Sequence, residues 1–162
     1  MLPKSEWAHL IPHAGTMCLL DEVVDWDAMR LHARSASHRR ADNPLRADGM
    51  LHAVNLCEYA AQAMAVHGAL RGREASGPAR PGFLVALRDV ALGVERIDDL
   101  PGRLQVHVEC LLAMADSLQY AFRVEHRGGM LANGRAAVML QPVAGMERLE
   151  SGMRRDDGEG RL

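Results

Sequence analysis

Residues 51–70, LHAVNLCEYAAQAMAVHGAL, constrain the fold more than any other segment of the chain. The segment contains no proline, its only glycine is Gly68, and it is rich in Ala, Leu and Met, which favour an α-helix. Apolar residues cover most of the circumference of this helix, and such a helix is normally buried. We expect Asp48 to cap its N-terminus, and Gly72 and then Gly77-Pro78 to mark its end.

Strand-like segments lie on both sides of the predicted helix. Two precede it, at residues 17–26 and 30–37, and four follow it, at residues 83–94, 104–115, 118–126 and 130–141. Apolar and polar residues alternate in several of these segments, so one face of each strand should be buried. The simplest arrangement is a long antiparallel sheet wrapped around one central helix, which is an α+β fold.

Length and composition are typical of one globular domain. The chain has 162 residues, of which 48% are hydrophobic. We expect residues 1–144 to form the domain, and the charged, glycine-containing residues 145–162 to form a poorly ordered tail. The three cysteines are scattered and form no CxxC pair, so we expect small buried thiols, without a disulfide framework or a metal site.

Several classes of partner and location are disfavoured by the sequence. The net charge of −2 and the aromatic content of 4% argue against nucleic acid as a partner. The sequence contains no run of about 18 apolar residues that could span a membrane. Residues 1–7, which include Lys4 and Glu6, do not resemble a signal peptide. A cytoplasmic location is therefore expected. The phosphate-loop, dinucleotide-binding and common zinc-protease motifs are also missing from the sequence.

Glu58 is the side chain of the helix that is best suited to chemistry. On a helix it shares a face with residues 54, 61 and 65, which are small and apolar, and with Gln62 one turn further on. A carboxyl group in apolar surroundings suits a residue that gives and takes protons near neutral pH. The alternative is a glutamate that points to solvent at the helix edge, or one that binds a partner in the core.

Eight histidines offer possible partners for Glu58, and most of them should be ordinary surface or packing residues. His13 precedes the first strand and has either a structural or a catalytic role. His52 stands at the start of the helix, from where it could reach a cleft. His67 lies nine residues after Glu58, on another face of the helix, and is expected to be a packing or surface residue.

Three strings of the sequence together resemble the FabZ-like 3-hydroxyacyl-[acyl-carrier-protein] dehydratases. IPHAGTMCLLDEVVDWD is similar to the family's N-terminal pattern, and LHAVNLCEYAAQAM is similar to its helix pattern. GFLVALRDVAL followed by DLPGRLQVHVE is similar to a later strand and a Pro-Gly turn of the family. The matching positions are Pro12, His13, Leu19, Leu20, Asp21, Val23, Val54, Glu58, Ala61 and Gln62. The resemblance covers residues 10–142, and EYAAQAMAVHGAL is most like the ApeP-like, aryl-polyene branch.

The resemblance implies a hotdog fold and a dimer, either a homodimer or a heterodimer with a second hotdog protein. It implies a 3-hydroxyacyl thioester substrate, carried on the phosphopantetheine of acyl carrier protein, and no other cofactor. A histidine from one subunit and an acidic residue from the other would remove water to give a trans-2-enoyl thioester. Glu58 would be the acid, and Gln62 would line the substrate site.

The sequence departs from the family pattern at the catalytic histidine. The family's Gly-His-Phe-Pro stretch is missing, and Pro44 stands at the matching spacing before Glu58. The base of a dehydratase would then be His52 or His13. Two other functions stay open: a hotdog thioesterase, in which the helix carboxylate activates water, and a non-catalytic subunit of a heterodimer.

Arginines suggest how an acidic acyl carrier protein would be recognised. They concentrate in the loop before the helix and after its end, where they could steer such a partner or could simply be solvated. They are Arg39, Arg40, Arg46, Arg71, Arg73 and Arg80.

Overall fold

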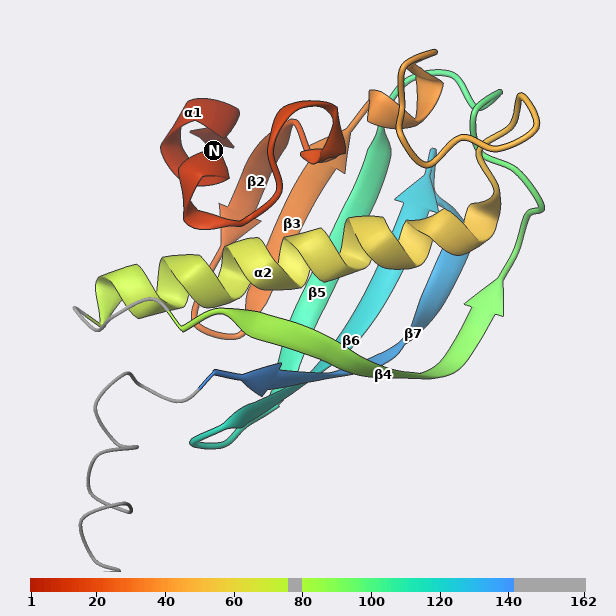
Figure 1. Cartoon of the computed structure of the whole chain (residues 1–162). Coiled ribbons are helices and arrows are strands. Elements are labelled where there is room, and N and C mark those ends of the chain that lie inside the picture. The colour runs from red at the N-terminus through yellow and green to blue at the C-terminus, as the bar shows by residue number, and fades with distance from the viewer. Residues whose placement is uncertain (76–79, 142–162) are drawn as a thin grey trace, which may run out of the picture.

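The computed structural model describes residues 1–75 and 80–141. Within them, seven antiparallel strands form one sheet that curls around the long helix α2 (Leu56–Glu74), as Figure 1 shows. The order across the sheet is β1 (Leu2–Pro3), β2 (Glu22–Trp26), β3 (Arg30–Ser35), β5 (Leu104–Ala113), β6 (Ser117–His126), β7 (Gly129–Leu140) and β4 (Gly82–Leu92). This is the α+β hotdog architecture that the sequence predicts.

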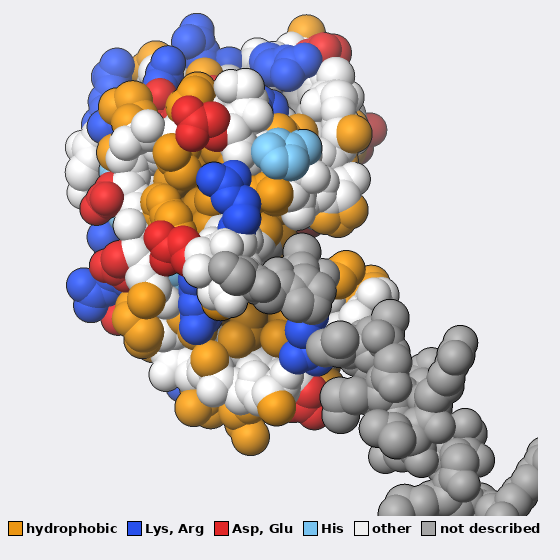
Figure 2. Space-filling model, turned by 90° about the vertical axis from the view of Figure 1, so that its left-hand side faces the viewer, with side chains coloured by type: hydrophobic (Ala, Val, Ile, Leu, Met, Phe, Trp, Pro, Cys, Tyr) orange, Lys and Arg blue, Asp and Glu red, His pale blue; other side chains and the backbone are white. Residues whose placement is uncertain are grey.

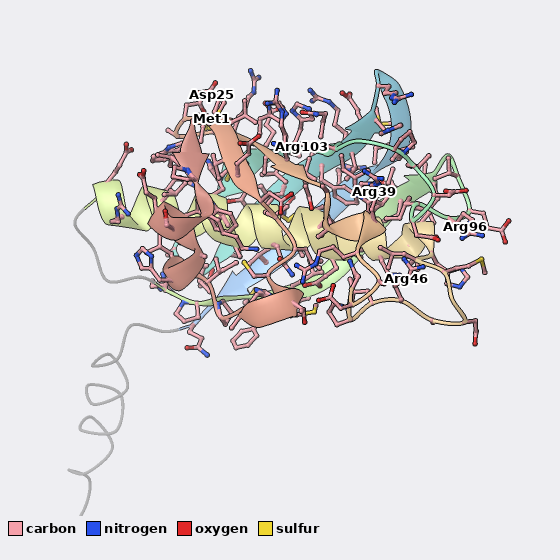
Figure 3. The ribbon with its side chains drawn as sticks, turned by 90° about the horizontal axis from the view of Figure 1, so that it is seen from above. Met1, Asp25, Arg39, Arg46, Arg96 and Arg103 are labelled. Atoms are coloured by element: carbon pink, nitrogen blue, oxygen red, sulfur yellow. The ribbon has the colours of Figure 1, made fainter. Side chains whose placement is uncertain are left out.

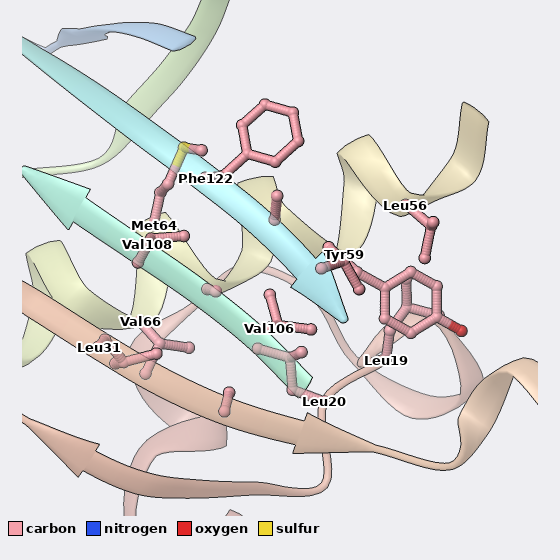
Figure 4. Packing of buried hydrophobic residues seen from close by; sticks show 14 of the residues in the cluster. Leu19, Leu20, Leu31, Leu56, Tyr59, Met64, Val66, Val106, Val108 and Phe122 are labelled. Carbon is pink, nitrogen blue, oxygen red and sulfur yellow. The ribbon is translucent and has the colours of Figure 1, made fainter. Parts of the chain in front are cut away.

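The core lies between α2 and the concave face of the sheet. On β5 buried and half-buried residues alternate, so Val106 and Val108 point toward the helix. Figure 4 shows them packing with Leu31 of β3 and with Tyr59 and Val66 of α2. Full burial of one such side chain stabilises the fold by roughly 1.5–3 kcal/mol.

Short N-terminal elements cover part of α2 that the sheet does not reach. They are α1 (Lys4–Trp7) and two single turns of 3₁₀ helix, η1 (Ala8–Leu10) and η2 (Gly15–Met17). The fully buried Trp7 anchors them in the core. Residues 11–19, which we call the N-terminal strap, lead from η1 to the first long strand of the sheet.

Residues 17–21 are not part of a strand, so the predicted strand over residues 17–26 is wrong in its first half. The backbone of Leu19 shows why. Its N–H donates to Oε1 of Gln62 (2.9 Å), and its carbonyl accepts from Oγ of Ser35 (2.6 Å). Because side chains satisfy these buried backbone groups, the segment needs no neighbouring strand.

The start of the helix also differs from the prediction. Asp48 is not its N-cap; it has a positive φ of 52° in a turn, and α2 begins only after Asn55. The backbone of residues 51–53 instead pairs with residues 95–97, through Ala53 N–H to Glu95 O and Ile97 N–H to Leu51 O. These bonds hold the segment extended, and a single 3₁₀ turn, η4 (Ala53–Asn55), then leads into α2.

At its other end α2 runs past Gly72 to Glu74, while Gly77-Pro78 and residues 145–162 lie outside the described residues. No helix among the described residues is long and apolar enough to cross a membrane. Cys18, Cys57 and Cys110 are buried free thiols, as the sequence predicts.

Strand β4 lies at one edge of the sheet and is almost entirely exposed. It pairs with β7 on one side, and its other side has no neighbouring strand in the described chain. Its exposed side chains are largely hydrophobic: Phe83, Leu84, Val85, Leu87, Val90 and Leu92. An exposed apolar sheet edge of this kind is a template for pairing with another chain.

Candidate active site

Glu58 lies in the first turn of α2, close to the helix N-terminus. Helix dipoles favour negative charge at this position. Its side chain is 31% exposed, so the carboxyl group is half-buried rather than enclosed in the core. A substrate can therefore reach it from the surface of the chain.

Gln62, one turn further along α2, is fully buried and fixes the carboxyl group of Glu58. Its Nε2 donates to Oε1 of Glu58 and to the carbonyl of Met17, both at 2.9 Å. Its Oε1 accepts from the backbone N–H of Leu19, also at 2.9 Å. The amide thus connects Glu58 to the N-terminal strap, and its orientation is determined by three hydrogen bonds.

His13 comes from the strap and meets Glu58 in the same chain. Its Nε2 lies 3.3 Å from Oε1 of Glu58, and its side chain is 27% exposed. Catalytic pairs are often somewhat longer before substrate binds than in the reacting complex. Of the two histidines that the sequence offers as the base, His13 is the one placed beside the carboxyl group.

The two ring nitrogens of His13 have different surroundings. Nδ1 is buried and has no hydrogen-bond partner among the described residues. A substrate cannot reach it, so Nε2 is the nitrogen that can exchange a proton. This nitrogen is also the one that faces Glu58.

The strap that carries His13 is held at three consecutive residues. The carbonyl of Met17 and the N–H of Leu19 bind Gln62, and Nζ of Lys4 donates to the carbonyl of Cys18 at 2.6 Å. Hydrogen bonds of this kind contribute about 0.5–1.5 kcal/mol each. They fix the direction in which the strap passes the first turn of α2.

The histidines His52, His38 and His67 lie elsewhere. His52 precedes η4, where its backbone bridges to Arg96, and no described contact joins its side chain to Glu58. His38 is buried and its Nε2 binds the carbonyl of Leu100. His67 is buried as a packing residue between the hydroxyl of Tyr120 and the carbonyl of Asp27.

Burial lowers the pKa of both His38 and His67, because desolvation disfavours the charged imidazolium. Both residues are therefore neutral structural groups at neutral pH. Neither shares an interaction with the group formed by His13, Glu58 and Gln62.

Two hollows on the described surface do not contain this group. One, of about 880 Å³, lies on the outer face of the sheet near His32, His107 and Arg123. The other, of about 580 Å³, lies near the C-terminal end of α2. The side chains of His13 and Glu58 are 27% and 31% exposed, so the group lies at the surface of the single chain.

Arginines lie at both ends of α2 rather than in one patch. Figure 3 shows Arg39 and Arg46 near the N-terminal end of α2, together with Arg96, whereas Arg71 and Arg73 lie in its last turn. The 19-residue helix separates the two groups by roughly 28 Å. Figure 2 shows positive and negative side chains interspersed on the side of the molecule that it presents.

At the N-terminal end of α2, acidic residues neutralise part of the positive charge. Asp98 binds both Arg46 (3.5 Å) and Arg96 (2.5 Å), and the Arg96 guanidinium holds the pKa of Asp98 far below its ordinary value. Among the described residues, no cluster of His, Cys, Asp and Glu is arranged to hold a metal ion.

Comparison with known proteins places the chain among dehydratases. The sequence pattern of the ApeP-like family, described as ApeP dehydratase, matches residues 5–149. A search of curated proteins finds no match.

Solved structures share the fold. The dehydratase heterocomplex ApeI:P from Xenorhabdus doucetiae has a TM-score of 0.77 at 21% identity, covering 93% of this chain and 98% of that one. AziG from S. sahachiroi has a TM-score of 0.58 at 17% identity, covering 76% and 92%. A hypothetical thioesterase with coenzyme A from Streptococcus pneumoniae TIGR4 has a TM-score of 0.59 at 11% identity, covering 85% and 96%.

Proposed function

The chain belongs to the ApeP-like dehydratase family, and we propose that it converts a 3-hydroxyacyl thioester on acyl carrier protein to the trans-2-enoyl thioester. The reaction would serve polyene-type or fatty-acid synthesis. The observation that carries the proposal is the position of His13, 3.3 Å from Glu58 on the first turn of α2. A dehydratase needs both a base and an acid at one carbon–carbon bond, and this pair supplies them.

The pair can divide the two proton transfers of dehydration. His13, through Nε2, removes the proton from C2, and the electron pair of that C–H bond forms the double bond to C3. The C3–O bond breaks as Glu58 gives its proton to the departing hydroxyl, which leaves as water. Well-placed acid–base groups typically contribute 10²–10⁴-fold each to the rate. Phosphopantetheine arrives with the substrate, so no further cofactor is required.

The His13–Glu58 contact favours dehydration over thioester hydrolysis. In a hotdog thioesterase a helix carboxylate activates water, and that reaction requires no histidine beside it. Here Oε1 of Glu58 lies 2.9 Å from Nε2 of Gln62 and 3.3 Å from Nε2 of His13. The arrangement suits two proton transfers at a substrate better than activation of one water molecule.

A hotdog partner subunit would complete the site. Strand β4 leaves an apolar edge uncovered, and Phe83 and Val85 are each 56% exposed. The similar structure from Xenorhabdus doucetiae is a dehydratase heterocomplex. We propose that β4 pairs with a second hotdog subunit, whose surface closes the channel over Glu58 and His13.

Acyl carrier protein would approach from the end of the molecule where α2 begins. Glu58 is in the first turn there, and Arg39 and Arg46 lie around the same end. Acidic carrier proteins are attracted to such side chains before they dock. Arg71, Arg73 and Arg80 lie at the far end of α2 or beyond it and would contribute less.

One assay tests the proposed reaction directly. The assembled protein is supplied with a 3-hydroxyacyl pantetheine thioester, and both the conjugated enoyl absorbance and the free thiol are followed. Dehydration predicts the absorbance without thiol release. Release of thiol without the absorbance would mean a thioesterase, and neither signal would mean a non-catalytic subunit.

A further inference from the structure

The first turn of α2, which carries Glu58, is not fixed by a capping side chain. Neither η4 nor α2 has a hydrogen bond from the side chain of its N-cap residue. Such a bond is the usual way in which the first N–H groups of a helix are held. The position of Glu58 therefore depends on the extended segment that leads into the helix, residues 51–53.

This extended segment is held against the connection between β4 and β5. The N–H of Ala53 donates to the carbonyl of Glu95, and the N–H of Ile97 donates to the carbonyl of Leu51, both at 2.9 Å. The N–H of Leu51 donates instead to a side chain, Oδ1 of Asp98, at 3.0 Å. Leu51 is fully buried, so this backbone group needs an acceptor within the protein.

Asp98 joins three parts of the chain through one carboxyl group, and its side chain is only 6% exposed. Besides the N–H of Leu51, it binds Nε (3.1 Å) and Nη2 (2.5 Å) of Arg96. Nη2 of Arg46, in the loop before the helix, lies 3.5 Å away and also donates to the carbonyl of Gly49. Figure 3 shows both arginines at this end of α2. The loop, the extended segment and the β4–β5 connection thus meet at Asp98.

Glu58 comes only five residues after Ala53, and the chain between them lies in η4 and the first turn of α2. Helical turns are rigid over so short a distance, so a shift of the extended segment moves the carboxyl group as well. A misplacement of about 1 Å can lower the rate of an enzyme roughly a hundredfold. The hydrogen bond between Leu51 and Asp98 is therefore close enough to the site to affect the chemistry.

We infer that Asp98 is a positioning residue: by accepting the N–H of Leu51 it fixes where α2 begins, and so places the carboxyl group of Glu58. It acts through the backbone of residues 51–58. The inference rests on the proposed dehydratase function for its effect on catalysis. Its structural part, the fixed start of the helix, can be measured without any activity.

The kinetics of Asp98 variants test the catalytic part. A pantetheine thioester serves as the substrate, so that docking of a carrier protein does not enter the rate. Asp98→Ala removes the acceptor, and we expect kcat of the assembled protein to fall about tenfold or more. KM should change little, because no substrate contact is lost.

Asp98→Asn is the conservative variant that should rescue the rate. It keeps an oxygen for the N–H of Leu51 but loses the negative charge, so kcat should stay within about twofold of the wild-type value. The neighbouring Asp99→Asn is the matched control, since Asp99 is 59% exposed, and it should behave as wild type. An equal loss of kcat in Asp98→Ala and Asp98→Asn would overturn the inference, because it would assign the effect to charge.

Asp98→Glu covers the case in which the alanine variant does not fold. It keeps the charge, but its longer side chain moves the acceptor, so kcat should fall by about threefold or more. Wild-type kcat in Asp98→Ala or, where that variant does not fold, in Asp98→Glu would overturn the inference.

Amide hydrogen exchange of the same variant tests the structural part. The amide protons of Leu51 and Ala53 should exchange about tenfold faster than in the wild-type protein, and those in the middle of β6 should change less. Unchanged exchange at Leu51 would overturn the inference. If the wild-type protein forms no enoyl thioester, the proposed function fails, and this measurement still decides whether Asp98 fixes the start of α2.

Discussion

At the scale of single residues, the site depends on a buried amide as much as on the groups that exchange protons. Gln62 is fully buried, and each of its hydrogen bonds goes either to Glu58 or to the strap that carries His13. It therefore links the position of the acid to the position of the base.

Replacing Gln62 by leucine should lower both stability and activity. The N–H of Leu19 and the carbonyl of Met17 would lose their partner, which costs about 2–4 kcal/mol in total. Glu58 would also lose its hydrogen bond, so the enoyl-forming rate should fall by about tenfold or more. Denaturant unfolding and the dehydration assay measure the two effects. The exposed Gln119→Leu on β6 is the control, and equal behaviour of the two variants would refute this role.

His107 should make the fold sensitive to acid. It stacks on His32 with ring centroids 4.1 Å apart, and desolvation, with the nearby charges of His32 and Arg123, lowers the pKa of His107 to about 4. An unfolded chain binds this proton near pH 6.5, so between pH 6.5 and 4 the unfolded state holds more protons. The free energy of unfolding should therefore fall as the pH is lowered through this range.

Protonation of His107 should lower the free energy of unfolding by at most about 3 kcal/mol over this pH range, because one pKa unit corresponds to about 1.4 kcal/mol. His107→Gln should flatten the dependence of the unfolding free energy on pH between 6.5 and 4. His9→Gln, at an exposed position, should leave the slope unchanged. An unaltered slope in the His107 variant would show that the imidazole does not carry the effect.

Part of the candidate site could be predicted from single residues. Helical periodicity placed Glu58 and Gln62 on one face, and the structure confirms that they are neighbours. The contact with His13 could not be derived, because residues 11–14 are irregular and no periodic pattern says where an irregular segment passes. Of the environments that the sequence left open for Glu58, the structure shows a side chain at the helix surface that is 31% exposed and hydrogen-bonded to Gln62.

At the scale of elements, α2 is joined to the loop before it by a buried polar cluster. The hydroxyl of Tyr59 hydrogen-bonds Oγ of Ser37 (2.8 Å) and accepts from Nδ2 of Asn43 (3.1 Å). The cluster connects the first half of the helix to the end of β3. It lies one residue along α2 from Glu58.

Removing the Tyr59 hydroxyl should loosen this connection without changing the fold. Tyr59→Phe leaves Ser37 and Asn43 short of one partner each, and we expect a loss of about 1–3 kcal/mol. Thermal or denaturant unfolding, with the far-ultraviolet circular dichroism spectrum as a check on the fold, measures this loss. An unchanged melting temperature would mean that the cluster contributes nothing to stability.

Sequence patterns predicted the existence of the elements better than their starting points. The apolar helix and the four strands after it follow from local periodicity, and each is present. The errors at residues 17–21 and at the helix start share one cause. In both places the backbone finds its hydrogen bonds with residues that are distant in the sequence, which a local pattern does not contain.

At the scale of the whole molecule, the proposed assembly depends on the exposed edge of β4. Val85→Lys would place a charge on this edge, where a positive side chain opposes pairing with another strand. We expect the complex to dissociate into smaller species, measured by light scattering after size-exclusion chromatography. Met29→Lys is the matched control, because Met29 is 49% exposed in the turn between β2 and β3. Equal masses for wild type and the Val85 variant would place the partner elsewhere.

The catalytic account rests on the Glu58 carboxyl group exchanging protons with a bound thioester. The most direct measurement is the rate of enoyl thioester formation by Glu58→Gln, a variant that keeps the size and hydrogen-bonding capacity of the side chain. We predict a loss of at least about a hundredfold, with folding and assembly unchanged. A variant that forms the enoyl thioester at the wild-type rate would contradict the account.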